Sequence, residues 1–302
     1  MSGRPRDASA RKTRSSTRLA TPELIGHRGA RGLYPENTIE GFRAALAAGI
    51  AAFEIDVALT RDEIVVLSHD PQLDPDITRG LNGHWLNGPG PLIAGLTYAD
   101  LAAYDVGRVR PGSATAVRFP DQEVVDGARI PALADVLSLD ERVHWTIEIK
   151  TFPPQPDWTA RPEALAAHVA TVADAVGASS RVTVQSFDWR GPRHLRRSRP
   201  DLAYAWLTCA ATANPLWWDR QPSASIPESV AAEGGGTWSP AYAELTRRDL
   251  DAAHRLGLRV VPWTVNDAQD AVRLAEWGVD GLITDRPDVL RAALRPPSSR
   301  AR

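Results

Sequence analysis

Cysteine and lysine are nearly absent from this 302-residue chain, which has one cysteine and two lysines. The single cysteine, Cys209, excludes an intrachain disulfide and a metal centre built from several thiolates. No apolar run approaches the roughly 18–20 residues of a membrane-spanning helix. The net charge of −2 lacks the positive surplus typical of nucleic-acid binders. We therefore expect neither a transmembrane segment nor a nucleic-acid partner.

The composition is that of a globular protein, with 43% hydrophobic and 24% charged residues. The length accommodates one large α/β domain or two of ordinary size. We predict a folded domain over residues 22–295, with disordered tails over 1–21 and 296–302. The first tail is basic and rich in serine and threonine. It has no apolar segment of the kind found in secretory signals, so we expect a cytoplasmic protein.

Strand-like runs of β-branched and aromatic residues alternate with amphipathic helical patterns. The predicted strands cover residues 23–27, 52–59, 63–69, 143–149, 181–187, 202–208, 258–265 and 280–285. Helical patterns that end at a glycine cover residues 37–49, 162–177, 245–257 and 267–278. This alternation predicts an α/β fold, a TIM (β/α)8 barrel in which the eight strands are parallel.

Three segments depart from the simple alternation. Residues 238–242 are a ninth strand candidate, which we place outside the barrel. The connection between the second and third strands is so short that we expect it to lack a helix. About sixty residues follow the third strand, which is too many for a simple loop. We predict a small insertion subdomain at about residues 71–130, with one helix near 97–107, over the mouth of the barrel.

Two carboxylates interrupt the apolar strand predicted over residues 52–59. Glu54 and Asp56 are two positions apart, so their side chains point to the same face of the strand. Two like charges in a buried strand repel each other and are costly to desolvate. A compensating positive charge is therefore expected beside them.

Further unusual side chains fall near the ends of the other predicted strands, and in a barrel those ends share one face. They are His27, Arg28, His69, Glu148, Lys150, Gln185, Phe187, Trp263 and Asn266. With Glu148 added to the acidic pair, three carboxylates favour a hard cation, Mg²⁺ or Ca²⁺. Such a cation beside Arg28 and Lys150 suits a phosphate. Two histidines suit proton transfer, so the combination predicts phosphodiester hydrolysis.

Several of these residues also have a purely structural interpretation. Glu148 and Lys150 are two apart on one strand and are consistent with a plain ion pair. His27 alone is equally consistent with a buried core histidine. Glu36 and Asn37 lie near the start of the first predicted helix, where they could support the site or cap the helix.

The order of the motifs resembles that of the glycerophosphodiester phosphodiesterase family. HRGARGLYPENT is followed by FEIDVALTRDEIVVLSHD, and then by IEIK, QSF, WTVN and GVDGLITDRPD. The resemblance extends from about residue 24 to residue 294 and implies a TIM barrel of the phospholipase C-like type. It implies one metal ion bound by Glu54, Asp56 and Glu148, with His27 and His69 as the acid–base pair.

The resemblance also implies a small-molecule substrate, a glycerophosphodiester cleaved to glycerol 3-phosphate and an alcohol such as choline or ethanolamine. Arg28 and Lys150 would bind the phosphate, and Phe187 and Trp263 would form the walls of the glycerol pocket. Two positions depart from the family's usual pattern. Glu63 stands where a glycine is frequent, and the first arginine after the His-Asp motif is delayed to Arg79.

Two alternatives of different kinds stay open at this stage. A related barrel acting on lysophospholipids would need an apolar rim, for which Trp85, Trp217 and Trp218 are the candidates. A non-catalytic binding protein on the same barrel would be expected to lack a metal ligand or a histidine, yet all five residues are present. The sequence leaves open a homo-oligomer, the native metal and the preferred alcohol.

Overall fold

The computed structural model describes residues 21–234 and 236–295. The tail predicted over residues 296–302, and all but the last residue of the tail predicted over 1–21, lie outside the described residues. None of the described helices combines the length and the apolar character that crossing a membrane requires.

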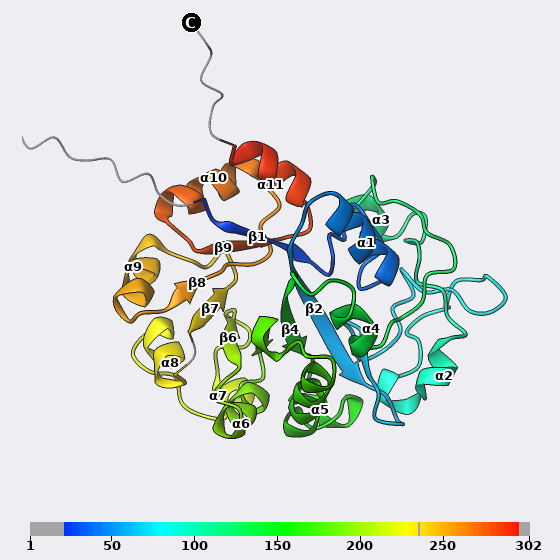
Figure 1. Cartoon of the computed structure of the whole chain (residues 1–302), viewed down its shortest axis with the longest axis horizontal. Helices are drawn as coiled ribbons and strands as arrows, with labels where there is room; N and C mark the ends of the chain where they lie inside the picture. Colours follow the sequence, from blue (N-terminus) through cyan, green and yellow to red (C-terminus); the bar gives the residue numbers. More distant parts are fainter. Residues whose placement is uncertain (1–20, 235, 296–302) are drawn as a thin grey trace, which may run out of the picture.

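Eight parallel strands form the barrel predicted from the sequence (Figure 1). They are β1 (Glu23–His27), β2 (Ala52–Leu59), β4 (His144–Ile149), β5 (Val182–Ser186), β6 (Ala203–Thr208), β7 (Thr237–Pro240), β8 (Arg259–Val260) and β9 (Gly281–Thr284). The strand order is β8-β7-β6-β5-β4-β2-β1-β9. Backbone hydrogen bonds also join the two ends of this order, from Asp280 N to Val260 O (2.9 Å) and from Ile283 N to Pro262 O (3.1 Å).

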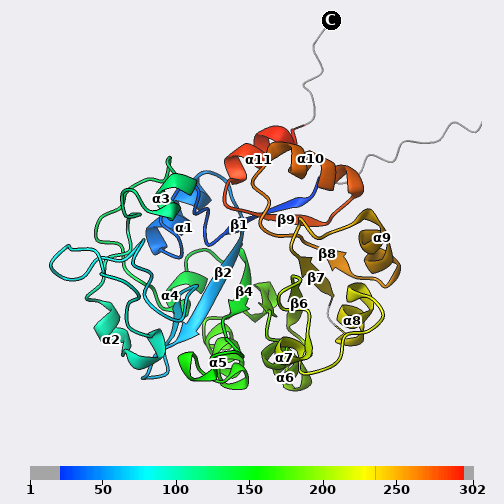
Figure 2. The same cartoon turned by 180° about the vertical axis from the view of Figure 1, so that it is seen from behind.

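Helices surround the strands, as the view from behind shows (Figure 2). Those that cover the barrel include α1 (Ile39–Ala47), α4 (Leu133–Leu137), α5 (Pro162–Ala175), α6 (Arg190–Ser198), α8 (Ile226–Ala232), α9 (Arg247–Arg255), α10 (Ala268–Trp277) and α11 (Pro287–Ala293). The four helices predicted to end at a glycine are present as α1, α5, α9 and α10. Gly278 ends α10 with φ 92°, a left-handed conformation that suits glycine.

The third predicted strand was wrongly assigned to the barrel, and the ninth candidate was wrongly excluded. β3 (Val65–Leu67) pairs with β2 in the antiparallel direction. The turn from Thr60 to Ile64 is short, and a parallel crossover needs about a dozen residues or more, so only a hairpin can form. β7 is instead one of the eight barrel strands, and it pairs with β6 and β8.

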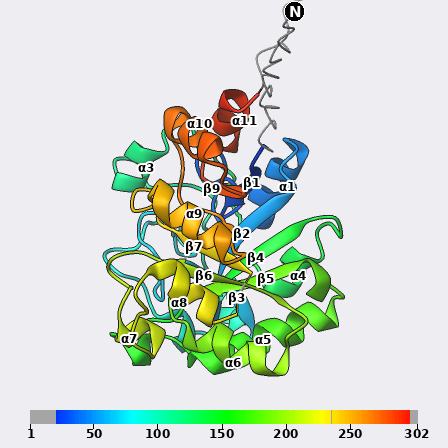
Figure 3. The same cartoon turned by 90° about the vertical axis from the view of Figure 1, so that its left-hand side faces the viewer.

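The segment between β3 and α4 carries η1 (Ile93–Gly95), α2 (Tyr98–Leu101) and α3 (Ala114–Arg118). The helix expected near residues 97–107 is shorter, since α2 ends at Leu101. Leu73, Ile93 and Leu101 of this segment pack into a small apolar cluster with residues of β2 and β3. The segment lies beside β2 (Figure 1), and in the side view α3 and α7 (Pro215–Trp218) lie to the left of the strands (Figure 3). That residues 71–130 form a separate subdomain stays a prediction.

Packing outside the barrel fixes the strands that carry the acidic residues. Phe42 of α1, Phe53 of β2 and Trp145 of β4 are fully buried, with ring centroids 5.3–5.4 Å apart. Because neighbouring side chains on a strand point to opposite faces, burying Phe53 outward directs Glu54 inward. The aromatic cluster therefore sets the orientation of the interior face.

Gly26, immediately before His27, offers a test of this packing. A Cβ there would overlap the carbonyl oxygen of Gly29 and would lie 3.0 Å from Phe53 Cδ1. We expect Gly26→Ala to lower the free energy of unfolding by about 1–3 kcal/mol, because the turn behind His27 must shift. Urea denaturation measures the change. Gly95→Ala is the control, since no heavy atom lies within 4 Å of its Cβ position; equal effects of both substitutions would contradict the prediction.

Candidate active site

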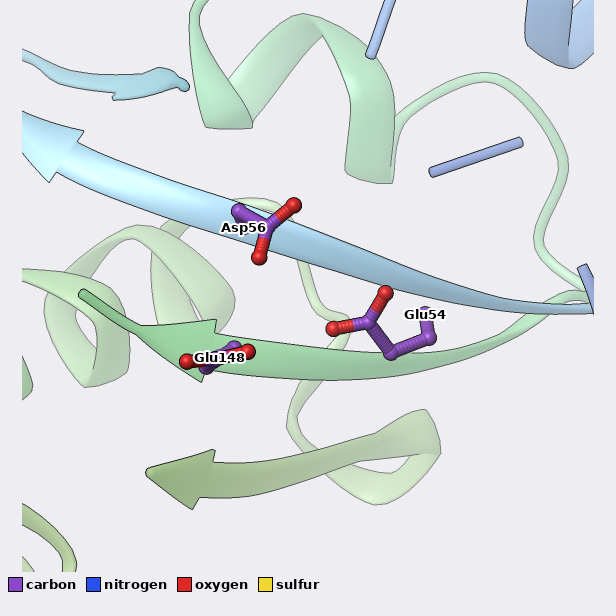
Figure 4. A group of neighbouring side chains, drawn as sticks. All are labelled: Glu54, Asp56 and Glu148. Atoms are coloured by element: carbon purple, nitrogen blue, oxygen red, sulfur yellow. The ribbon is translucent and has the colours of Figure 1, made fainter. Parts of the chain in front are cut away.

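Three buried carboxylates from the neighbouring strands β2 and β4 meet inside the barrel. Glu54 and Asp56 project from β2, and Glu148 projects from the position on β4 that pairs with Asp56 (Figure 4). One oxygen from each residue can be chosen so that all three lie within 4.8 Å of one another. The exposed fractions of the three residues are 2%, 0% and 6%.

Burial and mutual repulsion separate the pKa values of the three carboxyls. Burial raises the pKa of Glu54 well above its ordinary value, and the charges of Asp56 and Glu148 raise it further. Burial also raises the pKa of Glu148, to about 7, against the opposing effect of Lys150. Burial would raise the pKa of Asp56 too, but the charges of Arg28 and Lys150 outweigh it and lower that pKa.

Two cations partly neutralise the three carboxylates. Arg28 Nε lies 3.1 Å from Asp56 Oδ2, and Lys150 Nζ lies 2.8 Å from Glu148 Oε1 and 3.5 Å from Asp56 Oδ1. Glu148 and Lys150 therefore form the ion pair that the structural interpretation expects, but Lys150 also contacts Asp56, so the pair belongs to the acidic group.

Two oxygens of the acidic group are buried without a hydrogen-bond partner. They are Glu54 Oε2 and Asp56 Oδ1. A buried carboxylate oxygen that accepts no hydrogen bond is unfavourable, and three nearby carboxylates are the ligands that hard divalent cations prefer. Glu54, Asp56 and Glu148 therefore fit one divalent cation of the Mg²⁺ or Ca²⁺ kind.

The two predicted histidines flank this group in unlike surroundings. His27, the last residue of β1, is buried; its Nδ1 lies 2.6 Å from Asp285 Oδ1 and its Nε2 lies 3.7 Å from Glu54 Oε2. Burial lowers the pKa of His27 to about 4, although Asp285 opposes the change. His69 follows β3, and its Nδ1 lies 2.8 Å from Asp70 Oδ1. Burial, followed by the charges of Lys150 and Arg28, also lowers the pKa of His69.

A cavity of about 200 Å³ connects these residues. Its lining includes His27, His69, Glu54, Glu148, Arg28, Lys150, Gln185, Phe187 and Trp263. Gln185 Nε2 donates to Glu54 Oε1 over 3.2 Å, and the rings of Phe187 and Trp263 meet edge to face with centroids 5.3 Å apart. The barrel thus brings most of the predicted polar residues and the two predicted aromatic walls around one cavity, with Asp56 directly behind Glu54 and Glu148.

Glu36 and Asn37 both contact the site, and neither caps the helix. Arg28 Nη1 donates to Glu36 Oε1 (2.9 Å), and Asn37 Nδ2 donates to Asp56 Oδ2 (3.3 Å). Thr38 is the residue that caps α1, with its side chain accepting from Gly41 N. The capping alternative is therefore wrong for both. Asn266 lies farther back and donates from Nδ2 to Asp285 Oδ2 over 2.7 Å.

Three residues near the cavity were not singled out from the sequence. Asp285 contacts His27, and Arg31 and Arg118 line the cavity beside it. Asp285 stands directly after β9, within the TDRPD motif, so the same reasoning about strand ends would have found it. Arg118 lies on α3, and no spacing signal connects that helix to the barrel strands.

Comparisons with known proteins agree on one family. The family model described as "Glycerophosphoryl diester phosphodiesterase family" matches residues 27–289. The "Glycerophosphodiester phosphodiesterase" of Caldanaerobacter subterraneus is 26% identical over 88% of this chain and 95% of that protein. A crystal structure of a "Putative glycerophosphoryl diester phosphodiesterase" from Silicibacter pomeroyi is 37% identical, with a TM-score of 0.84 over 91% of this chain and 93% of that one.

A more distant structure shares the fold. It is an Oleispira antarctica phosphodiesterase in complex with sn-glycerol-3-phosphate, 23% identical, with a TM-score of 0.70 over 91% of this chain and 97% of that one.

The raised pKa of Glu148 predicts how the chelated protein responds to pH. Between about pH 4.5 and pH 7 the folded state retains a proton on Glu148 that the unfolded state has released. This contribution stabilises the fold fully below about pH 4.5 and is lost as the pH rises through about 7. Glu148→Gln removes it, so we expect the free energy of unfolding of the variant, relative to wild type, to rise by up to about 3 kcal/mol across that window.

Urea denaturation at several pH values in the presence of EDTA measures this difference. Comparing the variant with wild type cancels the titration of carboxyls far from the site, whereas Glu54, whose pKa the charge of Glu148 raises, contributes to the difference. A difference between the two proteins that stays constant from pH 4.5 to 7.5 would contradict the prediction.

Proposed function

The chain belongs to the glycerophosphoryl diester phosphodiesterase family and is a phosphoric diester hydrolase of that family, and from this premise we propose its reaction. It hydrolyses glycerophosphodiesters to glycerol 3-phosphate and an alcohol such as choline, ethanolamine or glycerol, with one divalent cation and two histidines. The observation that carries the proposal is a cavity of about 200 Å³ lined by Glu54, Glu148, both histidines, Arg28 and Lys150, with Asp56 in the same acidic group behind its wall.

Glu54, Asp56 and Glu148 would hold the cation, which is Mg²⁺ or Ca²⁺. When bound, such a cation polarises a phosphoryl oxygen and offsets the negative charge that develops during hydrolysis. The charges of the site support this assignment. Among these five residues, the three ionised carboxylates outweigh Arg28 and Lys150 by one negative charge, which favours binding of a cation.

Arg28 and Lys150 are the phosphate-binding residues in this proposal. Both side chains are largely buried at the cavity wall, and acidic partners hold them in place. Glu36 fixes one end of the Arg28 guanidinium over 2.9 Å, so its position does not depend on substrate. Fixed cations stabilise the developing charge without reorganising during the reaction.

His27 and His69 carry the proton transfers. One takes the proton of the attacking hydroxyl, and the other gives a proton to the leaving alkoxide. The nucleophile is a water molecule or the 2-hydroxyl of the glycerol unit, and in the second case the product forms through a cyclic phosphate. Phe187 and Trp263 form the apolar wall against which the glycerol carbons lie, with Gln185 beside them.

A groove next to the cavity favours a second candidate, hydrolysis of lysophospholipids. It has a volume of about 340 Å³ and is lined by Pro71, Leu73, Pro75, Pro89, Phe152 and Trp158, together with the acidic pair Asp70 and Asp74 and with Gln72. An acyl chain could lie along its apolar side while the phosphate stays near His69. Of the rim tryptophans expected from the sequence, Trp218 does not fit this role, because it is fully buried against Trp189. Trp85 and Trp217 are half-buried, and Trp217 meets Phe187 of the cavity wall edge to face, with ring centroids 6.4 Å apart.

The first experiment measures release of glycerol 3-phosphate from glycerophosphocholine by the purified protein. We expect activity to disappear after chelation and to return with Mg²⁺ or Ca²⁺, because the acidic group needs a counter-charge to bind a phosphate. Lysophosphatidylcholine is assayed in parallel. Turnover of that lipid alone would favour the second candidate, and activity unchanged by chelation would contradict the proposed cation.

Substitution of either histidine tests the acid–base assignment. We expect His27→Ala and His69→Ala each to lower kcat by about 10²–10⁴-fold, the usual contribution of a positioned acid or base. His84→Ala is the control, because His84 is exposed in the segment after β3 and does not line the cavity. Near-normal kcat in both site variants, with thermal unfolding unchanged, would exclude the assignment.

A further inference from the structure

Asp285 occupies an unusual position behind His27. Its exposed fraction is 0%, and its Oδ1 lies 2.6 Å from His27 Nδ1. Arg31 Nε donates to the same oxygen over 2.7 Å, and Asn266 Nδ2 donates to Oδ2 over 2.7 Å. The Asp285 backbone N–H donates in turn to Asn266 Oδ1 over 2.9 Å, which fixes the orientation of the Asn266 amide.

The neighbours of this carboxylate determine which His27 nitrogen carries a proton. Arg31 Nε can only donate a hydrogen bond, and the Asn266 amide presents its NH₂ because its oxygen is already engaged. Both Asp285 oxygens are therefore acceptors. An acceptor 2.6 Å from His27 Nδ1 requires a proton on Nδ1, so in the neutral ring Nε2 holds the lone pair.

We propose that Asp285 is a positioning residue that holds His27 in the Nδ1–H tautomer, so that Nε2 is the atom that exchanges a proton with the substrate. This inference rests on the proposed role of His27 in hydrolysis. The geometry agrees, since Nε2 is the ring nitrogen on the side of the acidic group, 3.7 Å from Glu54 Oε2.

The proton balance is the same in either direction of transfer. When Nε2 takes a proton, an N–H bond forms as the O–H bond of the hydroxyl breaks, and that electron pair stays on the oxygen. His27 then carries protons on both nitrogens, and the Asp285 carboxylate faces the positive ring. When the proton leaves Nε2, the Nδ1–H bond to Asp285 is retained, so the ring returns to the same tautomer.

Two comparisons within the chain separate this role from simple burial of an aspartate. Asp70 makes the corresponding contact with His69, but its side chain is 47% exposed and competes with water. Asp188 is as buried as Asp285 and pairs with Arg190, but it contacts Thr151 and no histidine. Asp188→Asn is therefore a matched control for the loss of a buried carboxylate.

Histidine ¹⁵N NMR tests the tautomer without any variant of Asp285. In the active wild-type protein, with and without Mg²⁺, we expect the His27 signal to report a protonated Nδ1 and an unprotonated Nε2. The signal is assigned by its absence from the His27→Ala spectrum. A protonated Nε2 in neutral His27 would overturn the inference, whereas a wild-type protein without hydrolytic activity would count against the proposed function instead.

Asp285→Asn tests the consequence for catalysis. An amide cannot accept from every donor around it, so we expect the Nδ1–H signature to be lost and kcat to fall by about 10²–10⁴-fold, with KM little changed. Asp188→Asn should leave both the tautomer and the ratio of kcat to KM as in wild type. Wild-type kcat in Asp285→Asn, or loss of kcat with the tautomer retained, would overturn the inference.

Discussion

The repulsion among three buried carboxylates is the constraint on which the site depends. Glu54, Asp56 and Glu148 each place a carboxylate oxygen within 4.8 Å of the other two, and all three residues are buried. Arg28 and Lys150 offset two of the three charges, and the pKa of Glu148 still rises to about 7. A bare arrangement of this kind is unfavourable, so its presence in a well-packed barrel is evidence of a ligand that compensates it.

The fold makes this arrangement rigid. The parallel register of β2 and β4 pairs Asp56 with Glu148, and the aromatic cluster of Phe42, Phe53 and Trp145 prevents the strands from rotating. A slip of one residue would turn the carboxylates outward and the aromatic rings inward, so burial of the rings and grouping of the carboxylates favour the same register. The same register of β2 and β4 therefore stabilises the barrel and groups the carboxylates.

Strand periodicity explains both what could be predicted from the sequence and what could not. The barrel and the convergence of residues such as His27, Glu148 and Gln185 follow from side-chain alternation and from the common end of parallel strands. The same alternation says nothing about strand direction. β3 was therefore placed in the barrel, although the short turn after Thr60 permits only a hairpin. The short run over residues 238–242 was placed outside as a ninth candidate beside eight other strand-like runs, and in the structure β7 has four residues. Arg118 reaches the cavity through the tertiary packing of α3, which no local pattern encodes.

The unequal surroundings of the two histidines follow from the same topology. His27 ends a barrel strand, so its partner Asp285 comes from the neighbouring strand end and is enclosed on every side. His69 follows a hairpin strand at the edge of the barrel, and its partner Asp70 comes from the next position in the chain and stays partly exposed. The segment after His69 also forms the groove beside the cavity. The barrel thus holds one histidine against its own core, while the other belongs to the segment that lines the groove. Changes in the segment after β3 can therefore alter the groove while His27, Asp285 and the acidic residues keep their positions.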